Sequence, residues 1–498
     1  MLAPMSVAQE PRARVVRPSV APLLALWLLQ LAAFFTPSAT WSPMTRFGLT
    51  HAVAENGSLN LGAWADATGD RAHVGDRWLS DKAPFPALLA VIPYTLTRTL
   101  HRILGHEAPS FEAESHGGVP AVRVTLNESA RQLLYASSVG VSGLAFMGLG
   151  LLLRVFLLRR FDERTALVAI TCVCLGTSIY PYGTSFYGHV PAAMCLLGAI
   201  VAVDGCAPTK RYAVAAACLV LAVGCEYIAL FPALLIGLHA LISGPRESRL
   251  MRLHALFLGA LPVALLLLGY HQIAFGAPWR TGYAFLRDPT FVAGHQRGLM
   301  GIGLPSGEAL FGLLVSPNRG LLWVAPISLL GLVGLVLWLR EKRTSDPTSV
   351  AFAFAFVALL LANAGYYMWW GGASAGPRHL VPMLSVLTLG VAHIWRLKHG
   401  PALVLPIATV SIAISVAFAA VGLEAPESGN LLTDFLLPRL LRGEVSSLPS
   451  ATNLGVLIGL PRALSLAPWL IFLVLVGRAI WLRTAPVVDE APPQETLA

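Results

Sequence analysis

The chain has 498 residues, of which 56% are hydrophobic and only 12% are charged, and its mean hydropathy is +0.67. Soluble globular proteins carry about 25% charged residues, so this composition excludes a soluble enzyme and indicates a polytopic helical membrane protein. The net charge of +9 is modest and typical of basic cytoplasmic loops, so we expect no nucleic-acid partner.

The N-terminal segment precedes the first apolar run, which extends from Val20 to Ala39. This run is long for a signal peptide, and no clear cleavage site stands before Trp41, so we expect an uncleaved first span. Six cysteines lie between Cys172 and Cys225, outside the long polar loops. They predict no disulfide framework, and the absence of zinc-ligand spacing assigns no metal ligand.

Apolar runs of roughly 20 residues recur along the whole chain and predict an all-α fold with about twelve transmembrane helices. Their expected ranges are roughly 20–40, 131–156, 164–182, 188–204, 212–227, 228–243, 254–275, 319–340, 349–366, 378–396, 402–423 and 464–482. Residues 1–483 form a single transmembrane domain in this interpretation, and the Pro- and Glu-rich tail 484–498 is expected to be disordered and cytoplasmic.

The segment 84–104 decides the topology. Its apolar core is interrupted by Pro86 and Pro93 and is followed by basic residues. If it does not span the membrane, most short basic loops fall on one side, which marks the cytoplasmic face. We therefore predict an interfacial helix here, both termini in the cytoplasm, and a large extracytoplasmic loop over 41–130.

This first loop carries four aspartates, which we interpret as candidate catalytic groups. Asp81 precedes Lys82 directly, and a carboxylate beside a cation stays ionised and can accept a proton from an attacking hydroxyl. The sequence favours Asp81 over Asp70 and Asp66, and places Asp76 last. A solvated loop without catalytic function is the alternative for each aspartate alone.

Other polar residues at the expected outer ends of spans are candidate substrate ligands. Arg378 follows a Trp- and Gly-rich turn and begins a span, where a guanidinium can bind phosphate in a bidentate manner. Arg319 and His189 also begin spans. A snorkelling arginine at a helix start is the alternative for Arg319, and for His189 an interface residue is favoured over a functional one. Glu226 lies within apolar sequence, which is costly and suggests function, unless it is hydrated at the mouth of a short helical hairpin.

The chain resembles the GT-C superfamily of integral-membrane glycosyltransferases, in particular the branch of lipid A aminoarabinose transferase and the protein O-mannosyltransferases. The resemblance covers the order of spans and the large first loop. Its local motifs are Thr45-Arg46-Phe47, Gly69-Asp70, Ser80-Asp81-Lys82-Ala83-Pro84, Ser316-Pro317-Asn318-Arg319-Gly320 and the stretch from Trp370 to Arg378. Arg46 joins the candidate substrate ligands through this resemblance.

One departure from the family pattern concerns the base. Many such enzymes carry an Asp-Glu pair after the first span, whereas this chain has no acid between Ser42 and Arg46. The family base therefore has no counterpart there, and another aspartate of the loop must replace it if activity is retained. The resemblance assigns no cofactor and leaves a divalent cation open, because relatives differ in metal dependence.

The resemblance implies sugar transfer from a polyprenyl-phosphate donor to a hydroxyl of a lipid, glycan or protein acceptor at the extracytoplasmic face of a bacterial inner membrane. Lys82, Arg378 and Arg319 would bind the phosphate. Three alternatives remain: a lipid or polysaccharide transporter or flippase, a polysaccharide polymerase, and a non-catalytic GT-C-like protein. A transporter would show internal repeats and charges near the membrane midplane, and the sequence has no evident repeat.

Overall fold

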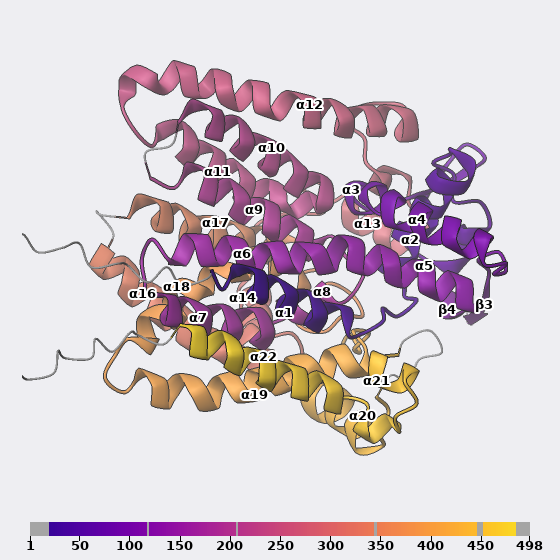
Figure 1. Ribbon diagram of the computed structural model, residues 1–498. Helices are drawn as coiled ribbons and strands as arrows, with labels where there is room; N and C mark the ends of the chain where they lie inside the picture. Colours follow the sequence, from indigo (N-terminus) through magenta and orange to yellow (C-terminus); the bar gives the residue numbers. More distant parts are fainter. Residues whose placement is uncertain (1–18, 117–118, 206–207, 343–345, 446–451, 485–498) are drawn as a thin grey trace, which may run out of the picture.

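A computed structural model describes residues 19–116, 119–205, 208–342, 346–445 and 452–484. It is a bundle of roughly parallel and antiparallel helices, and the segment between α1 and α6 projects from one end of the bundle (Figure 1). Almost all of the expected C-terminal tail lies outside the described residues.

Each of the twelve predicted apolar segments contains a helix. In chain order they hold α1 (Ala21–Ala33), α6 (Leu144–Leu157), α7 (Glu163–Gly176), α9 (His189–Val203), α10 (Thr209–Cys225), α11 (Leu230–Ile242), α12 (Arg249–Phe275), α16 (Ile327–Lys342), α17 (Pro347–Gly365), α18 (Leu387–Trp395), α19 (Gly400–Val421) and α22 (Ala467–Arg483). Within the described ranges, five stretches are long and apolar enough to cross a membrane: Glu128–Leu157, Arg246–Phe275, Pro347–Gly365, Gly400–Val421 and Arg462–Arg483. The count of twelve spans stays a prediction.

Shorter helices connect these elements. They are α8 (Ile179–Gly183), α13 (Pro289–His295), α14 (Gly307–Leu314), α15 (Leu321–Val324), α20 (Leu437–Leu441), α21 (Leu454–Leu457) and the irregular helix η6 (Arg378–Val386). Side chains fix several helix starts, since Asp162 caps α7 and Asp346 caps α17 by accepting backbone N–H bonds. The main core is a large apolar cluster in which α10 packs between α9 and α12, and α16 packs on α18, and two smaller apolar clusters involve the segment 41–130.

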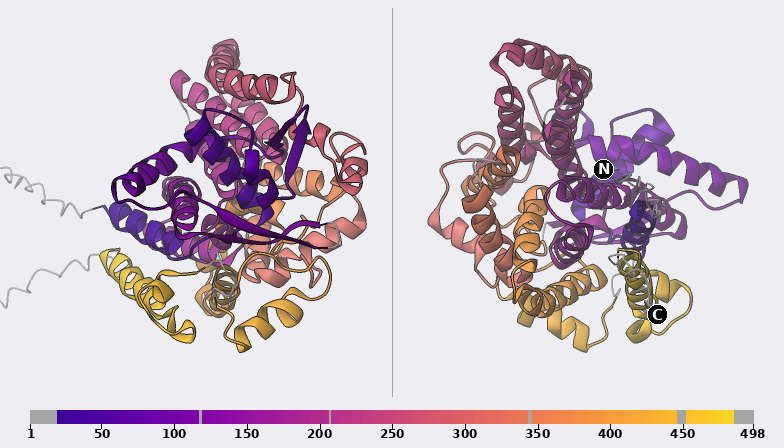
Figure 2. Two further views of the ribbon diagram at one scale, coloured as in Figure 1. Left: turned by 90° about the vertical axis from the view of Figure 1, so that its right-hand side faces the viewer. Right: turned by 60° about the vertical axis from the view of Figure 1, so that its left-hand side comes forward.

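The segment 41–130 is folded rather than a plain loop. It contains α2 (Trp41–Asn56), α3 (Phe85–Leu89), α4 (Val91–Ile103) and α5 (Glu128–Ser138), which leads into α6. It also contains two antiparallel hairpins, β1 (Arg71–Val74) with β2 (Arg77–Ser80), and β3 (Phe111–His116) with β4 (Val119–Leu126). The all-α prediction was wrong for these strands, which the left view of Figure 2 shows in front of the bundle.

Local sequence explains both the hairpins and α4. Gly75 adopts a φ of 63° between β1 and β2, a turn conformation that glycine adopts without a steric penalty. In α4, Ile92, Leu96, Leu100 and Ile103 form an exposed apolar stripe. Such a stripe is typical of a helix lying in a membrane surface, and the interfacial position stays a prediction.

Candidate active site

A charged cavity of about 80 Å³ lies where the segment 41–130 meets the end of the bundle. Its wall includes three cationic and three carboxylate side chains from segments far apart in the sequence. They are Arg46 from α2, Asp70 before β1, Asp81 and Lys82 after β2, Glu226 between α10 and α11, and Arg378 at the start of η6. His189, at the first position of α9, also lines the cavity.

Lys82 bridges two carboxylates. Its Nζ lies 3.0 Å from Asp81 Oδ2 and 3.2 Å from Asp70 Oδ2. Burial and, more weakly, the Asp70 charge raise the pKa of Asp81 to about 6, although Lys82 opposes this shift. Burial lowers the pKa of Lys82, but the two carboxylates raise it by more, so Lys82 remains a cation. The cluster therefore holds a positive charge on Lys82 beside a carboxyl group that titrates near pH 6.

Close packing positions Asp81. Thr45 Oγ1 of α2 donates a 3.0 Å hydrogen bond to Ser80 Oγ at the end of β2. On the other side, a Cβ atom at Gly282 would lie 2.5 Å from Asp81 Cα. Only glycine permits this approach, so the backbone of the 276–318 segment packs directly against Asp81 and fixes its position in the cavity wall. Asp81 is 3% exposed, and its Oδ1 has no hydrogen-bond partner among the described residues.

Glu226 has a partner rather than lying idle in water. Arg46, 1% exposed, donates from Nη2 to Glu226 Oε1 at 2.9 Å and from Nη1 to Ser42 Oγ at 2.6 Å. His189 Nδ1 lies 3.3 Å from the same glutamate oxygen. The Arg46–Glu226 pair thus links α2 to the junction of α10 and α11. In this part of the cavity wall the two opposite charges balance each other.

Arg378 is the cation of the cavity that has no carboxylate within ion-pair distance in the described part of the chain. Its Nε is buried and also lacks a hydrogen-bond partner there. Gly371 and Gly372 precede it with φ angles of 79° and 69°, and a Cβ at Gly371 would lie 3.1 Å from Arg378 Nε. The glycine turn therefore leaves space around a guanidinium that can bind an anion.

Two predicted site residues lie elsewhere. Arg319 is fully buried and donates to the carbonyl oxygens of Asn318, Trp370, Gly372 and Pro426 at 2.8–3.1 Å, so its donors are engaged with backbone. Asp66 has a 77% exposed side chain and pairs with Arg71 at 3.0 Å. Neither is among the residues that line the charged cavity.

A second cavity of about 440 Å³ adjoins the first and shares Ser42, Asp70, Phe291, Met368 and Arg378 with it. Its other walls are β4, the glycine turn and the segment after α19, which contributes Glu424 and Glu427. Burial raises the pKa of Glu424 to about 7. Sequence reasoning missed both glutamates, because nothing local distinguishes them from ordinary loop acids.

A third cavity, of about 100 Å³, extends from the charged cavity along α11. It shares Glu226, Tyr283, Tyr366 and His379 with the charged cavity, and its remaining walls are mostly apolar. Sequence reasoning also missed Tyr283, which lies in an irregular segment. The charged cavity therefore connects the larger cavity, which holds Glu424 and Glu427, on one side with a smaller and mostly apolar cavity on the other.

The carboxylates of the cavity do not form a metal site. Within the described ranges, no group of three or more His, Cys, Asp or Glu side chains is arranged to hold a metal ion. Lys82 Nζ already takes the position between Asp70 and Asp81 that a cation bridging them would need. This donor set therefore does not fit a divalent cation.

Solved structures similar to this chain include two of ArnT from Cupriavidus metallidurans, one in the apo state and one bound to undecaprenyl phosphate. Each is 14% identical to this chain over 93% of it and 75% of ArnT, with TM-scores of 0.47 and 0.46. No family model and no curated protein sequence matches. At this identity residue roles do not transfer, so they are argued from this chain's own geometry.

Proposed function

We propose that the chain is a membrane glycosyltransferase that moves a sugar from a polyprenyl-phosphate donor to an acceptor hydroxyl at the extracytoplasmic face. The observation that carries the proposal is the Asp70–Lys82–Asp81 cluster beside Arg378, which has no carboxylate partner among the described residues. Cations with uncommitted donors suit a phosphate, and an adjacent carboxylate suits removal of a proton from a hydroxyl.

The donor lies across the charged and the apolar cavities in this proposal. Its phosphate binds Lys82 and Arg378, and its polyprenyl chain leaves along the apolar cavity beside α11. As the bond between the anomeric carbon and the phosphate oxygen breaks, the leaving phosphate keeps the electron pair. The two cations stabilise the negative charge that develops on that oxygen.

The acceptor enters through the larger cavity. Asp70 lines both this cavity and the charged one, whereas Asp81 lines the charged one. A base must first be within reach of the proton that it removes, so we assign proton abstraction to Asp70, reversing the sequence-based order. The acceptor oxygen then forms the new bond to the anomeric carbon. Asp81 acts as a positioning residue that shares Lys82.

Transfer by the purified chain tests this proposal, with a polyprenyl-phosphate sugar as donor. We expect Asp70→Asn to lower turnover by about 10²–10⁴-fold while donor binding persists. Asp76→Asn is the matched control, because Asp76 is exposed and outside the cavity lining. Equal turnover in both variants would contradict the assignment of the base. Donor binding without transfer by the unchanged chain would instead indicate a non-catalytic lipid-binding protein.

The proposed orientation places both termini in the cytoplasm of a bacterial inner membrane and residues 105–116 outside. We expect an impermeant thiol reagent to label a cysteine introduced at Ser115 in intact cells. A cysteine introduced at Arg249 should react only after lysis. The reverse pattern would place the charged cavity on the cytoplasmic side and exclude an extracytoplasmic reaction.

A further inference from the structure

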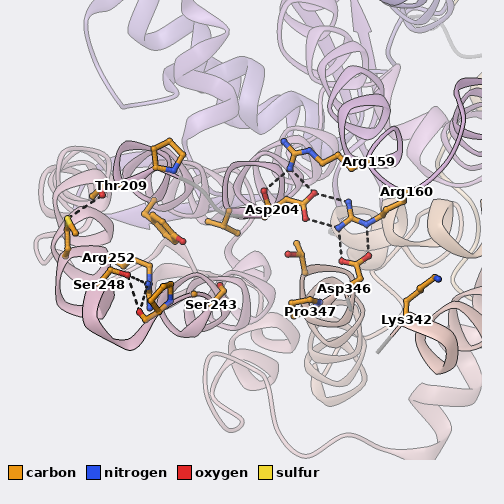
Figure 3. Close-up of a pocket in the computed structure, with 18 of the residues that line it drawn as sticks. Arg159, Arg160, Asp204, Thr209, Ser243, Ser248, Arg252, Lys342, Asp346 and Pro347 are labelled. Atoms are coloured by element: carbon orange, nitrogen blue, oxygen red, sulfur yellow. Dashed lines mark hydrogen bonds and ion pairs between the residues drawn. The ribbon is translucent and has the colours of Figure 1, made fainter. Parts of the chain in front are cut away.

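A large cavity of about 940 Å³ lies at the end of the bundle opposite the candidate active site. It is formed by the ends of α6, α9, α11 and α16 and by the beginnings of α10, α12 and α17. Figure 3 shows its two polar groups, a network around Arg160 and a second group around Arg252. Four cationic side chains line it against two carboxylates, Asp204 and Asp346.

The two carboxylates are already neutralised. Arg160 donates to both oxygens of Asp204 at 2.8–2.9 Å and to both oxygens of Asp346 at 2.7–2.8 Å. Arg159 also donates to Asp204 at 2.9 Å. The network therefore forms a rigid wall, and Arg252 leaves the cavity with an excess of positive charge, while Lys342 pairs with Glu341 at 3.0 Å.

Arg252 has an open donor. It is 3% exposed, its Nε donates to Leu241 O, and its Nη1 donates to Pro245 O and Ser248 Oγ. Its Nη2 is buried and has no hydrogen-bond partner among the described residues. A buried donor without a partner costs about 1–3 kcal/mol, and this one belongs to a guanidinium held rigidly in the cavity wall.

The start of α10 adds a second positively polarised group to the cavity wall, beside Arg252. Pro208 and Thr209 line the cavity, and the N-cap residue Pro208 supplies no side-chain hydrogen bond to the first turn. Arg211 N–H donates to Pro208 O at 2.9 Å, and the 17-residue helix α10 directs the positive end of its dipole at the cavity, an arrangement that binds phosphate groups. Tyr212, Met251 and Trp338 give the cavity an apolar side.

We propose that this cavity binds a phosphate-bearing anion between Arg252 and the N-terminus of α10. The shared chemistry is a phosphate oxygen accepting from Nη2 and from backbone N–H groups. A lipid headgroup and a soluble phosphate are the two sources that an experiment must separate. The apolar side favours the lipid, whose chains would continue along the exposed Leu250 and Leu253 of α12. The site is independent of the proposed glycosyl transfer.

Binding is measured on the full chain in detergent by native mass spectrometry. Short-chain phosphatidylglycerol and inorganic phosphate are the two probes, and diacylglycerol is the uncharged lipid comparison. We expect retention of phosphatidylglycerol and not of diacylglycerol. Retention of inorganic phosphate with equal affinity would support the same site with a soluble source.

Arg252→Gln should weaken binding by about 10-fold or more, because a charged hydrogen bond is removed. Arg249→Gln is the matched control: it removes the same charge three residues away, outside the cavity lining. Lys82→Met, at the other end of the bundle, should leave this binding unchanged, which separates it from binding of a glycosyl donor.

Thr209→Glu is a second test that does not depend on the folding of the Arg252 variant. Thr209 is exposed, and an acid in the first turn of a helix is favourable, so α10 should form normally. Its carboxylate would take the place of the anion and reduce binding by about 10-fold or more. Binding that is equal in the unchanged chain, Arg252→Gln and Thr209→Glu, or absent from the unchanged chain, would overturn the proposal.

Discussion

Lys82 at one end of the bundle and Arg160 at the other each lie between one buried and one partly buried carboxylate, but the two clusters have opposite properties. Arg160 donates to all four oxygens of Asp204 and Asp346. Lys82 contacts one oxygen each of Asp70 and Asp81, and Asp81 Oδ1 has no partner in the described part of the chain.

The difference appears in the protonation of the acids. Burial opposes ionisation of Asp204 and Asp346, but the hydrogen bonds from Arg160 lower the pKa of both. At Lys82, burial dominates and the pKa of Asp81 rises to about 6. Saturated hydrogen bonding therefore makes a structural clamp, whereas incomplete bonding around a point charge leaves a carboxyl group that titrates near pH 6.

The largest expected effect on activity comes from the Lys82 cluster, whereas a substitution in the Arg160 cluster should affect stability. Lys82→Met should lower turnover by about 10²–10³-fold, because one of the charges that stabilise the leaving phosphate is removed. Transfer from a polyprenyl-phosphate sugar measures it. Lys398→Met, on the exposed surface after α18, is the control. Unchanged turnover in Lys82→Met would remove Lys82 from the mechanism.

Arg160→Met should instead destabilise the fold by about 3–5 kcal/mol, because Asp346 loses its cation and the buried Asp204 keeps only Arg159. Unfolding of the detergent-solubilised chain by denaturant measures this free energy. Arg159→Met is the matched comparison, since Arg159 is 38% exposed and contacts Asp204 alone, and it should cost less. A loss below about 1 kcal/mol in Arg160→Met, the range of exposed pairs, would contradict the description of a clamp.

Arg378→Lys tests whether the planar fork matters or only the positive charge. We expect kcat/KM to fall by about 10-fold, the loss of one charge-assisted hydrogen bond, because an ammonium cannot reproduce bidentate phosphate binding. The steady-state kinetics of transfer measure it. If Arg378→Lys has the same kinetics as the unchanged chain, bidentate binding by Arg378 is excluded and only its positive charge matters.

The smallest expected effect concerns Asp81 and pH. Above about pH 6 the carboxyl group of Asp81 is ionised, and its added negative charge favours proton uptake by the cluster. We therefore expect activity to increase as the pH is raised through about 6, and to be lower below that pH. Asp81→Asn should keep more activity than Asp70→Asn and lose this dependence on pH. A preserved acidic limb in Asp81→Asn would assign the titration to another group.

Much of the fold was predictable because apolar length and proline interruptions act locally. The helices of the predicted spans and the change of character at 84–104 follow from such signals. The hairpins were missed because β1, β2 and β3 are short and largely polar, although Gly75 and the pair Gly117-Gly118 stand between the paired strands. Asp81 and Lys82 were recognisable as neighbours in sequence. Tyr283 and Glu424 were not, because tertiary packing alone brings them to the cavities.

Arg319 has a mechanical consequence for the larger cavity. By holding Trp370, Gly372 and Pro426 through their carbonyl oxygens, it makes the glycine turn and the segment carrying Glu427 one rigid unit. The opposite wall is β4, which Trp41 Nε1 holds through a 3.1 Å hydrogen bond to Ala121 O. Trp64 also packs on Phe111 of β3, and Val124 of β4 is buried in the cluster beneath the hairpin. We therefore expect a bulky molecule to enter by displacing the β3–β4 hairpin, so that the packing of this hairpin sets the width of the entrance.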